Sequence, residues 1–414
     1  MPFINDRLRD QRVAQGEVDQ AAGLEAPDQE GFALAAAGRV NAERIRAQLE
    51  SRIFGQPLAV DSVYRTMQVI QAGLADRERP LASHLFVGPT GTGKTEIVRQ
   101  LAATLRSGPD DFCRVDMSAL AQEHYAASFA GAPPGYAGSK EGHSVFRRDQ
   151  VEGELGKPGI VLFDEVEKAH QTVVRALLHV LDHGVLHLAN GEQRFNFRNC
   201  IVFLTSNLGS REIRDLQQSR PRRWARRHVE NASSHLPESA RQWLRQRLEG
   251  RIHEITQDAL EKYFDPEFLN RVDEVTVFSE LSQDVALRIA QAELDLVVGR
   301  AQTKGVDILL GPEVVRHVAQ MGFDASYGGR SIRREVRHTV WPIVARHVIT
   351  QRLRRLDIPQ CQSTVRLSLS APDRRGQRHV IAAEESTHPL PRNTTTAPGT
   401  PGAGPENRKE EESS

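Results

Sequence analysis

A short apolar run, a glycine-rich loop and a helical pattern follow one another between Leu85 and Leu101, and this order constrains the fold more than any other feature. Leu85–Val87 is typical of a buried strand, while the spacing of Ile97, Val98 and Leu101 predicts a helix. The loop between them has the spacing G-x-x-x-x-G-K-[ST]. Its eight residues are Gly88, Pro89, Thr90, Gly91, Thr92, Gly93, Lys94 and Thr95. A strand, such a loop and a helix begin a βαβ unit.

The chemistry of this loop predicts a site for the phosphates of a nucleotide. Its glycines let the backbone point several N–H groups inward, at the positive end of the following helix. The ammonium group of Lys94 would neutralise the β- and γ-phosphates, and the hydroxyl of Thr95 would bind Mg²⁺. We therefore expect all eight loop residues to bind nucleotide, with Mg²⁺ as the cofactor. A plain glycine turn is the alternative for the loop taken alone.

Three more apolar runs have the length and composition of buried strands, and helical patterns separate them. They lie at Phe112–Val115, Ile160–Phe163 and Ile201–Leu204. Near-continuous apolar strands that alternate with helices are typical of a parallel sheet covered on both faces. The sequence therefore predicts an α/β fold, a P-loop domain with a doubly wound parallel sheet.

Polar residues at the ends of two of these strands complete a hydrolytic site. Asp164 follows the strand Ile160–Phe163 directly and would hold the Mg²⁺ shell, while Glu165 would polarise the attacking water. Two acids in tandem fit hydrolysis of ATP. Asn207 ends the next strand, beside Asp164 in a doubly wound sheet, where it can hydrogen-bond the γ-phosphate or the water. A solvated strand end and a turn asparagine are the alternatives for these residues.

Charge and composition exclude several kinds of partner and site. Lys+Arg and Asp+Glu are both 54, so no net charge attracts nucleic acid or an anionic membrane. The three cysteines have no Cys-x-x-Cys spacing, which argues against a disulfide framework and a thiolate metal site. We find no signal-peptide core near the N-terminus and no apolar run of the roughly 18 residues that span a membrane. These features predict a cytoplasmic protein without a membrane partner.

Composition divides the chain into four parts. Residues 1–38 are polar and poorly periodic, and we expect a flexible leader there. Residues 39–278 are expected to form the large ATPase domain. Residues 279–384 should form a smaller, mainly helical lid domain that ends in a short β-hairpin between Val365 and Ala382. Residues 385–414 are rich in Pro, Gly, Thr and charge, which predicts a disordered tail.

An arginine-rich insert lies inside the large domain at residues 211–251. It holds eleven arginines, no lysine and five acidic residues. In Arg220–His228 a tryptophan stands among arginines, a pattern that nucleic-acid-binding segments share. A solvated helical insertion is the other interpretation, because arginine is frequent throughout this chain.

With these motifs in place, the sequence resembles the Clp/Hsp100 branch of the AAA+ unfoldase family, in particular the second ATPase domain of the ClpB and ClpA type as a stand-alone, single-ring protein. The similarity runs from Ile53 to Leu356 and rests on eight motifs in the order of the family. They are IFGQ at 53–56, the phosphate loop, GAPPGYAG at 131–138, FDEVEKAH at 163–170, FRN at 197–199, TSNLGS at 205–210, DPEFLNRVDE at 265–274 and YGGRSIRR at 327–334.

The resemblance implies roles that spacing alone does not assign. Ile53 and Phe54 should border the adenine, and Asn207 occupies the position of the first sensor. Arg271 matches the arginine finger, which acts on the γ-phosphate bound by a neighbouring subunit. Arg330 matches the arginine of the second sensor. Without the resemblance both arginines would be taken as solvated surface residues. A finger that acts across a subunit boundary implies an oligomer, and in this family a homohexamer.

Tyr136 is the residue that the resemblance connects to a polypeptide substrate. It lies on a loop framed by glycine and proline, and in similar proteins this loop lines the axial channel of the ring. An aromatic ring suits that position because it packs on any side chain; a tyrosine that packs on its own loop is the alternative.

The implied function is an ATP-driven motor that pulls polypeptide through a channel, with a nucleic-acid-associated ATPase as the alternative. Some relatives carry a protease-docking tripeptide, an aliphatic residue followed by Gly and by Phe or Leu, in an exposed loop after the first sensor. This tripeptide is not evident here, because the similar sequence Met321–Phe323 falls inside the lid domain.

Overall fold

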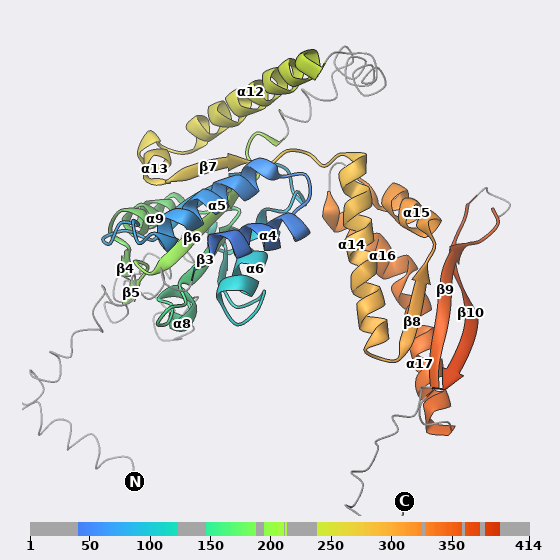
Figure 1. The fold of residues 1–414 in the computed structure, drawn as a ribbon. Coiled ribbons are helices and arrows are strands. Elements are labelled where there is room, and N and C mark those ends of the chain that lie inside the picture. The colour runs from blue at the N-terminus through green and yellow to red at the C-terminus, as the bar shows by residue number, and fades with distance from the viewer. Residues whose placement is uncertain are drawn as a thin grey trace, which may run out of the picture. The chain divides into compact units, whose positions relative to one another are not determined.

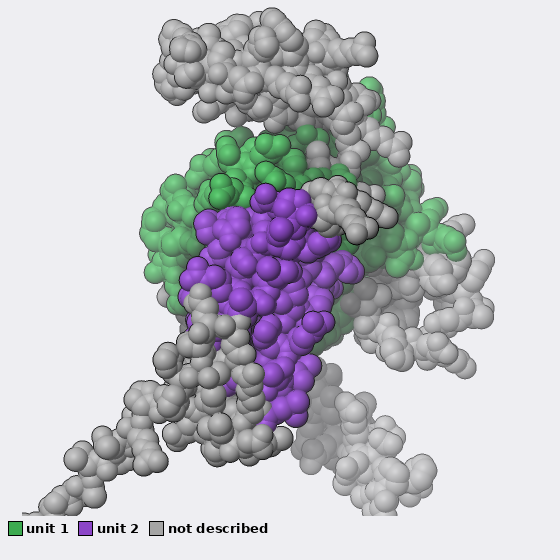
Figure 2. Space-filling model, turned by 90° about the vertical axis from the view of Figure 1, so that its right-hand side faces the viewer, with its two compact units in different colours: residues 1–293, 316–336 green, residues 294–315, 337–414 purple. Residues whose placement is uncertain are grey.

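The computed structural model describes residues 40–122, 146–187, 194–210, 212, 238–324, 328–357, 361–372 and 377–389. The chain divides into two compact units (Figure 2). Unit 1 comprises residues 1–293 and 316–336, and unit 2 comprises residues 294–315 and 337–414. The predicted leader, Tyr136, most of the arginine-rich insert and the chain after Pro389 lie outside the described residues.

Five parallel strands form the sheet of unit 1, in the order β2-β3-β6-β1-β7 (Figure 1). They are β1 (Ala82–Val87), β2 (Cys113–Asp116), β3 (Gly159–Asp164), β6 (Cys200–Ser206) and β7 (Glu274–Val277). The three central strands are buried along their whole length, which explains their nearly continuous apolar sequence. Strands distant in sequence pair with one another, as in a doubly wound sheet, and the predicted fold class is confirmed.

Helices cover both faces of this sheet and bury two separate hydrophobic clusters. The helices that line the first face are α4 (Ala42–Arg52), α5 (Pro57–Gln71) and α6 (Lys94–Leu105). Those of the second face are α9 (Gln171–His183), α12 (Glu238–Tyr263) and α13 (Pro266–Arg271). Alternate side chains of β1 enter the two clusters: Phe86 lies in the first, while Leu85 and Val87 lie in the second.

Short elements connect these layers. They are the 3₁₀-helices η1 (Met117–Leu120) and η2 (Val166–Lys168), the helix α8 (Arg148–Val151) and the paired strands β4 (Val185–His187) and β5 (Arg194–Asn196). None of the helices in the described ranges is both long and apolar enough to cross a bilayer.

The C-terminal part is mainly helical and includes a three-stranded sheet. Its helices are α14 (Gln283–Gln302), α15 (Pro312–Gly322), α16 (Gly329–Thr339) and α17 (Trp341–Asp357), of which α14, α15 and α16 contribute residues to both units. Its strands are β8 (Val306–Leu310), β9 (Cys361–Leu369) and β10 (Val380–Pro389). The predicted hairpin is present as the antiparallel pair β9–β10.

Two predicted boundaries differ from the observed elements. Strand β10 pairs with β9 as far as Pro389, beyond the residue at which we expected the tail to begin, because backbone hydrogen bonds do not require aliphatic side chains. The arginine-rich insert does not end at Arg251 as a separate segment. Its last part is the beginning of α12, which continues to Tyr263 and buries Ile252 and Leu260.

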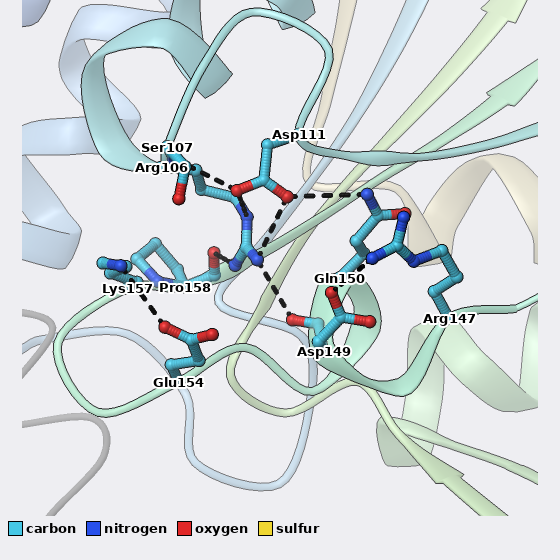
Figure 3. A network of polar contacts seen from close by, with 9 residues as sticks. All are labelled: Arg106, Ser107, Asp111, Arg147, Asp149, Gln150, Glu154, Lys157 and Pro158. Atoms are coloured by element: carbon cyan, nitrogen blue, oxygen red, sulfur yellow. Dashed lines mark hydrogen bonds and ion pairs between the residues drawn. The ribbon is translucent and has the colours of Figure 1, made fainter.

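A polar network joins the end of α6 to the start of β3 (Figure 3). The Arg106 side chain, which is 2% exposed, donates to the carbonyl groups of Pro158 (3.0 Å) and Asp149 (3.2 Å) and forms an ion pair with Asp111 (3.3 Å). Burial raises the pKa of Asp111, but the backbone N–H of Ser107 (3.1 Å) and the charge of Arg106 together bring that pKa below its ordinary value. A single buried guanidinium therefore connects three segments of unit 1.

Replacing Arg106 with Ala should lower the free energy of unfolding by about 3 kcal/mol, because it leaves carbonyl groups and a carboxylate without their partner. Urea denaturation measures this difference. Arg147→Ala is the matched control, because Arg147 is 68% exposed and its pair with Asp149 is worth at most about 1 kcal/mol. Equal stability of the two variants would contradict a structural role for the network.

His84 is a buried histidine in the middle of β1. Its ring stacks on Phe203 with the centroids 5.5 Å apart, and its Nδ1 lies 3.5 Å from the hydroxyl of Ser62. Among the described residues its Nε2 atom has no hydrogen-bond partner. Burial lowers the pKa of His84 to about 4, although the carboxylates of Glu274 and Asp273 oppose this shift.

Stability should therefore fall as the pH decreases from about 6.5 towards 4. In this window the unfolded chain binds a proton that native His84 does not accept, so acid favours unfolding. We expect a loss of about 2 kcal/mol between pH 7.5 and pH 5 from this residue. His84→Phe should flatten the pH dependence measured by urea denaturation, while the control His253→Gln, at an exposed position, should not. An unchanged slope for His84→Phe would contradict the neutral, buried imidazole.

Candidate nucleotide site

The phosphate loop connects β1 to α6 and depends on glycine at several positions. Gly88, Gly91 and Gly93 have φ angles of 142°, 77° and 110°, a region that favours glycine. At Gly88 an added Cβ would also lie 2.5 Å from the carbonyl oxygen of Phe278. The Thr92 hydroxyl donates to the carbonyl of Pro89 (2.9 Å) and stabilises the turn.

Lys94 lies at the start of α6 with its ammonium group turned back over the loop. It is only 8% exposed and donates to the carbonyl groups of Gly88 and Pro89 and to Oδ1 of Asn207 (3.0 Å). Burial lowers the pKa of Lys94 to about 8, and the carboxylates of Glu167 and Asp164 limit this shift. A desolvated cation held by neutral oxygen atoms is suited to bind an anionic ligand.

Asp164 ends β3 at the carboxyl edge of the sheet. Its Oδ1 accepts a hydrogen bond from the Thr205 hydroxyl on the neighbouring strand β6. Its Oδ2 pairs with Arg114 of β2, whose Nη2 lies at 2.5 Å and Nε at 3.1 Å. Adjacent strands thus fix both oxygen atoms of the carboxylate. The sequence did not identify Arg114 or Thr205, because the spacing along the chain does not reveal which strands are neighbours.

Glu165 follows with φ of 60°, and it is the one non-glycine residue with a positive φ among the described residues. Strained backbone of this kind is concentrated at functional sites. Its backbone N–H donates to the Thr205 hydroxyl (3.0 Å), and its Oε1 accepts from the Asn207 amide (3.1 Å). Since Lys94 donates to the other end of the same amide, a continuous chain Lys94–Asn207–Glu165 crosses the site.

Glu167 is a further residue of the site that we did not predict. Its Oε1 accepts the backbone N–H of Asn207 (3.1 Å), and its Oε2 is buried without a hydrogen-bond partner among the described residues. The hydroxyl of Tyr263 in α12 donates to its carbonyl group. Glu167 therefore positions Asn207 through its backbone. Its place two residues after Glu165 in the motif FDEVEKAH is the sequence signal that could have identified it.

The segment expected beside the adenine contacts α14. Ile53 is buried in the same cluster as Ile97 of α6, and the guanidinium of Arg288 lies 4.5 Å from the centroid of the Phe54 ring. Gly55 has φ of 76°, and an added Cβ there would lie 2.8 Å from Val285.

The first residue of helix α16 contacts the phosphate loop. The backbone N–H of Gly329 donates to the carbonyl of Gly91 (2.9 Å), and an added Cβ at Gly328 would lie 2.6 Å from the same oxygen. Arg330 follows; it is exposed, and its charge contributes to the lowered pKa of Lys94. The second-sensor position is thus close to the predicted phosphate site.

Arg271 is not part of this group. It ends α13, its side chain is 43% exposed, and its Nη1 lies 2.6 Å from Oδ1 of Asp182 in α9. No contact between Arg271 and the phosphate loop is present in the described parts of the chain. Thr95 lies in the first turn of α6, and Tyr136 lies outside the described residues.

Comparisons with known proteins match both halves of the chain. Residues 79–275 match the family model of the AAA domain (Cdc48 subfamily), and residues 281–358 match that of the C-terminal, D2-small domain of ClpB protein. The solved structure of Hsp104 with ATPγS and FITC casein is similar with a TM-score of 0.60 and 26% identity, over 87% of this chain and 53% of that chain.

Curated relatives of two lengths are similar to this chain. An ATP-dependent protease ATP-binding subunit-like protein of Rhodococcus erythropolis is 46% identical over 85% of this chain and 93% of its own length. The corresponding AmiB protein of Pseudomonas aeruginosa is 40% identical over 84% and 93%. The chaperone protein ClpB of Vibrio vulnificus is 35% identical over 74% of this chain but only 32% of its own length. The chain therefore belongs to the Clp/Hsp100 family of AAA+ ATPases, with a domain like the second ATPase domain of ClpB, and it hydrolyses ATP.

Proposed function

We propose that this protein is an ATP-driven remodelling motor that assembles into a ring and pulls polypeptide through an axial channel. The observation that carries the proposal is the hydrogen-bonded chain Lys94–Asn207–Glu165 at the carboxyl edge of the sheet, in a protein of the Clp/Hsp100 family. This arrangement joins the group that would hold the phosphates to the group that would act on water.

Each residue of the site has a distinct task in this proposal. The backbone of the phosphate loop and Lys94 would hold the phosphates, while Ile53 and Phe54 would border the adenine. Glu165 would accept the proton of the attacking water, and Asn207 would orient the Glu165 carboxylate, to which it already donates a hydrogen bond. These positions favour hydrolysis because they fix donor and acceptor before the reaction begins.

The oxygen donors at the site fit Mg²⁺. Thr95 offers a hydroxyl group in the first turn of α6, and Asp164 offers a carboxylate that Thr205 and Arg114 hold in place. When bound there, Mg²⁺ would supply positive charge against the phosphate oxygens. Thr205 and Arg114 use three of the roughly four acceptor positions of the Asp164 carboxylate, so they fix its orientation and leave one position for a cation.

The position of Arg271 is an argument for assembly into a ring. An exposed arginine at the end of α13, without contact to its own phosphate loop, is suited to reach the nucleotide of a neighbouring subunit. Arg330 would act within its own subunit, because its helix begins on Gly91. In the proposed homohexamer every site would therefore combine residues from two chains.

ATP hydrolysis in the presence of different polymers tests the proposal. An unfolded protein should raise the hydrolysis rate, whereas DNA and RNA should leave it unchanged at both low and high salt. Stimulation by nucleic acid that weakens with salt would instead assign a nucleic-acid motor to the arginine-rich insert, since contacts with phosphates depend strongly on salt. The absence of any effect from unfolded protein would contradict the motor.

Tyr136→Ala should reduce the ratio of protein-stimulated to unstimulated hydrolysis to about one. Unstimulated hydrolysis needs only the nucleotide site, whereas binding of the polypeptide in the channel needs the aromatic ring. Tyr136→Phe is the matched control, since it keeps the ring and should retain the stimulation. Steady-state phosphate release measures both ratios. Full stimulation of Tyr136→Ala would contradict the channel role of this residue, and failure to fold would show that its ring packs in a core.

A further inference from the structure

One guanidinium group joins the ends of two helices on the face of unit 1 that carries Arg271. Arg79, which precedes β1, donates through Nε to the carbonyl of Leu181 in the last turn of α9 (2.9 Å). Its Nη2 donates to the carbonyl of Arg271, the last residue of α13 (2.7 Å). The final carbonyl groups of a helix have no partner within the helix, so Arg79 satisfies one such group on each.

The chain that follows α13 is fixed to the same place. Asp273 pairs with Nη2 of Arg79 (3.4 Å), and its Oδ2 accepts both the backbone N–H and the hydroxyl of Ser83 (2.7 Å each). The Ser83 hydroxyl also accepts the backbone N–H of Asp273 (2.9 Å). The carbonyl group of Arg271 and the residue Asp273 are therefore both held by hydrogen bonds, and the backbone at Arg271 has little freedom to move relative to β1.

The guanidinium group of Arg271 is held through one of its nitrogen atoms. Its Nη1 pairs with Asp182, which is 21% exposed and belongs to the same last turn of α9 that Arg79 binds. A guanidinium has five N–H donors, and an ion pair through one nitrogen leaves the others for a second anion. The 43% exposure of the Arg271 side chain is consistent with such a division of its donors.

We propose that Asp182 and Arg79 are positioning residues for Arg271: Arg79 fixes its backbone, and Asp182 points its guanidinium towards the nucleotide of the neighbouring subunit. Neither residue touches the phosphate loop of its own chain in the described structure. The inference rests on the proposed action of Arg271 across a subunit boundary. The sequence gives no indication of this pair, because Asp182 and Arg271 lie far apart along the chain and only the packing of α9 against α13 brings them together.

Asp182→Ala should lower kcat for ATP about 10- to 100-fold, the usual effect of a displaced reacting group. The KM for ATP should stay within about twofold, since residues that bind ATP in the same subunit are untouched. Asp182→Asn, which keeps an acceptor oxygen without the charge, should lie between the wild type and Asp182→Ala. Asp61→Ala removes an exposed aspartate that pairs with Arg46 and should leave the rate unchanged.

Mixed rings separate positioning from a general structural role. Glu165→Gln subunits cannot hydrolyse ATP but carry an intact Arg271, so an excess of them should raise the hydrolysis rate per Asp182→Ala subunit. A variant whose own nucleotide site is damaged would gain nothing from such neighbours. Wild-type turnover of Asp182→Ala and Asp182→Asn, or a low rate that mixing never raises, would overturn the inference.

Arg271→Ala in the same mixtures separates the action of Arg271 across the subunit boundary from its positioning by Asp182. If Glu165→Gln subunits raise its rate while Asp182→Ala is fully active alone, Arg271 acts across the boundary and only the positioning inference fails. If Arg271→Ala is not rescued although mixed rings form, the proposed role of Arg271 fails and the inference fails with it.

Discussion

Replacing Glu165 with Gln should stop ATP hydrolysis while ATP binding remains at its wild-type affinity. The amide keeps the size of the side chain and an oxygen that accepts from Asn207, but it cannot take a proton from water. A positioned base contributes about 10²–10⁴-fold to such reactions, so we expect turnover to fall at least about 100-fold. Phosphate release measures the turnover, and equilibrium titration with nucleotide measures the affinity.

Glu154→Gln is the matched control for this variant. Glu154 is 55% exposed and pairs with Lys157, so the same chemical change at that position should leave hydrolysis as it is. Wild-type turnover of Glu165→Gln would remove this residue from the role of base. The strained backbone at φ of 60° would then need another explanation, such as the placement of η2.

Replacing Lys94 with Ala should weaken nucleotide binding by at least about 30-fold. The ammonium group is almost completely buried, and loss of one partner from a buried charge pair costs about 2–5 kcal/mol. This range corresponds to a decrease in affinity of roughly 30-fold to several thousand-fold. Lys157→Ala, at an exposed position, is the control. Calorimetric titration that gives wild-type affinity for Lys94→Ala would contradict the phosphate site.

The strand, loop and helix around Lys94 could be predicted from the sequence because their signal is local. The glycines, the lysine and the apolar spacing all lie within one stretch of chain, and the structure has β1 and α6 at those positions. The sequence also predicts that Asp164 and Asn207 lie side by side, because the carboxyl ends of parallel strands share one edge of the sheet. The structure agrees, since β3 and β6 are neighbours.

Residues that support the site could not be predicted in the same way. Arg114 reaches Asp164 only because β2 pairs with β3 in a register that sets Asp116 opposite Asp164. The contact between Gly329 and Gly91 joins segments that are distant in sequence, and it depends on a glycine at position 328 that leaves room for the loop carbonyl. Such contacts follow from tertiary packing, and no local pattern encodes them.

The hairpin of strands β9 and β10 also extends past the residue at which we expected the C-terminal tail to begin. The residues after Glu384 are polar, so they cannot add to a hydrophobic core, and we expected a tail there. Strand β10 nevertheless continues, because its backbone groups pair with β9 up to the partners Pro389 and Cys361. A hairpin extends as long as its partner strand provides donors and acceptors.

The most direct test of the proposed motor uses a folded reporter domain fused to an unstructured polypeptide. The fluorescence of the reporter is recorded while the wild-type protein hydrolyses ATP in the presence of excess trap that captures unfolded reporter. We predict that fluorescence decreases with ATP and stays constant with the Glu165→Gln variant or with a non-hydrolysable analogue. Constant fluorescence with the wild-type protein, under conditions in which the fused polypeptide stimulates ATP hydrolysis, would contradict a motor that pulls polypeptide through a channel.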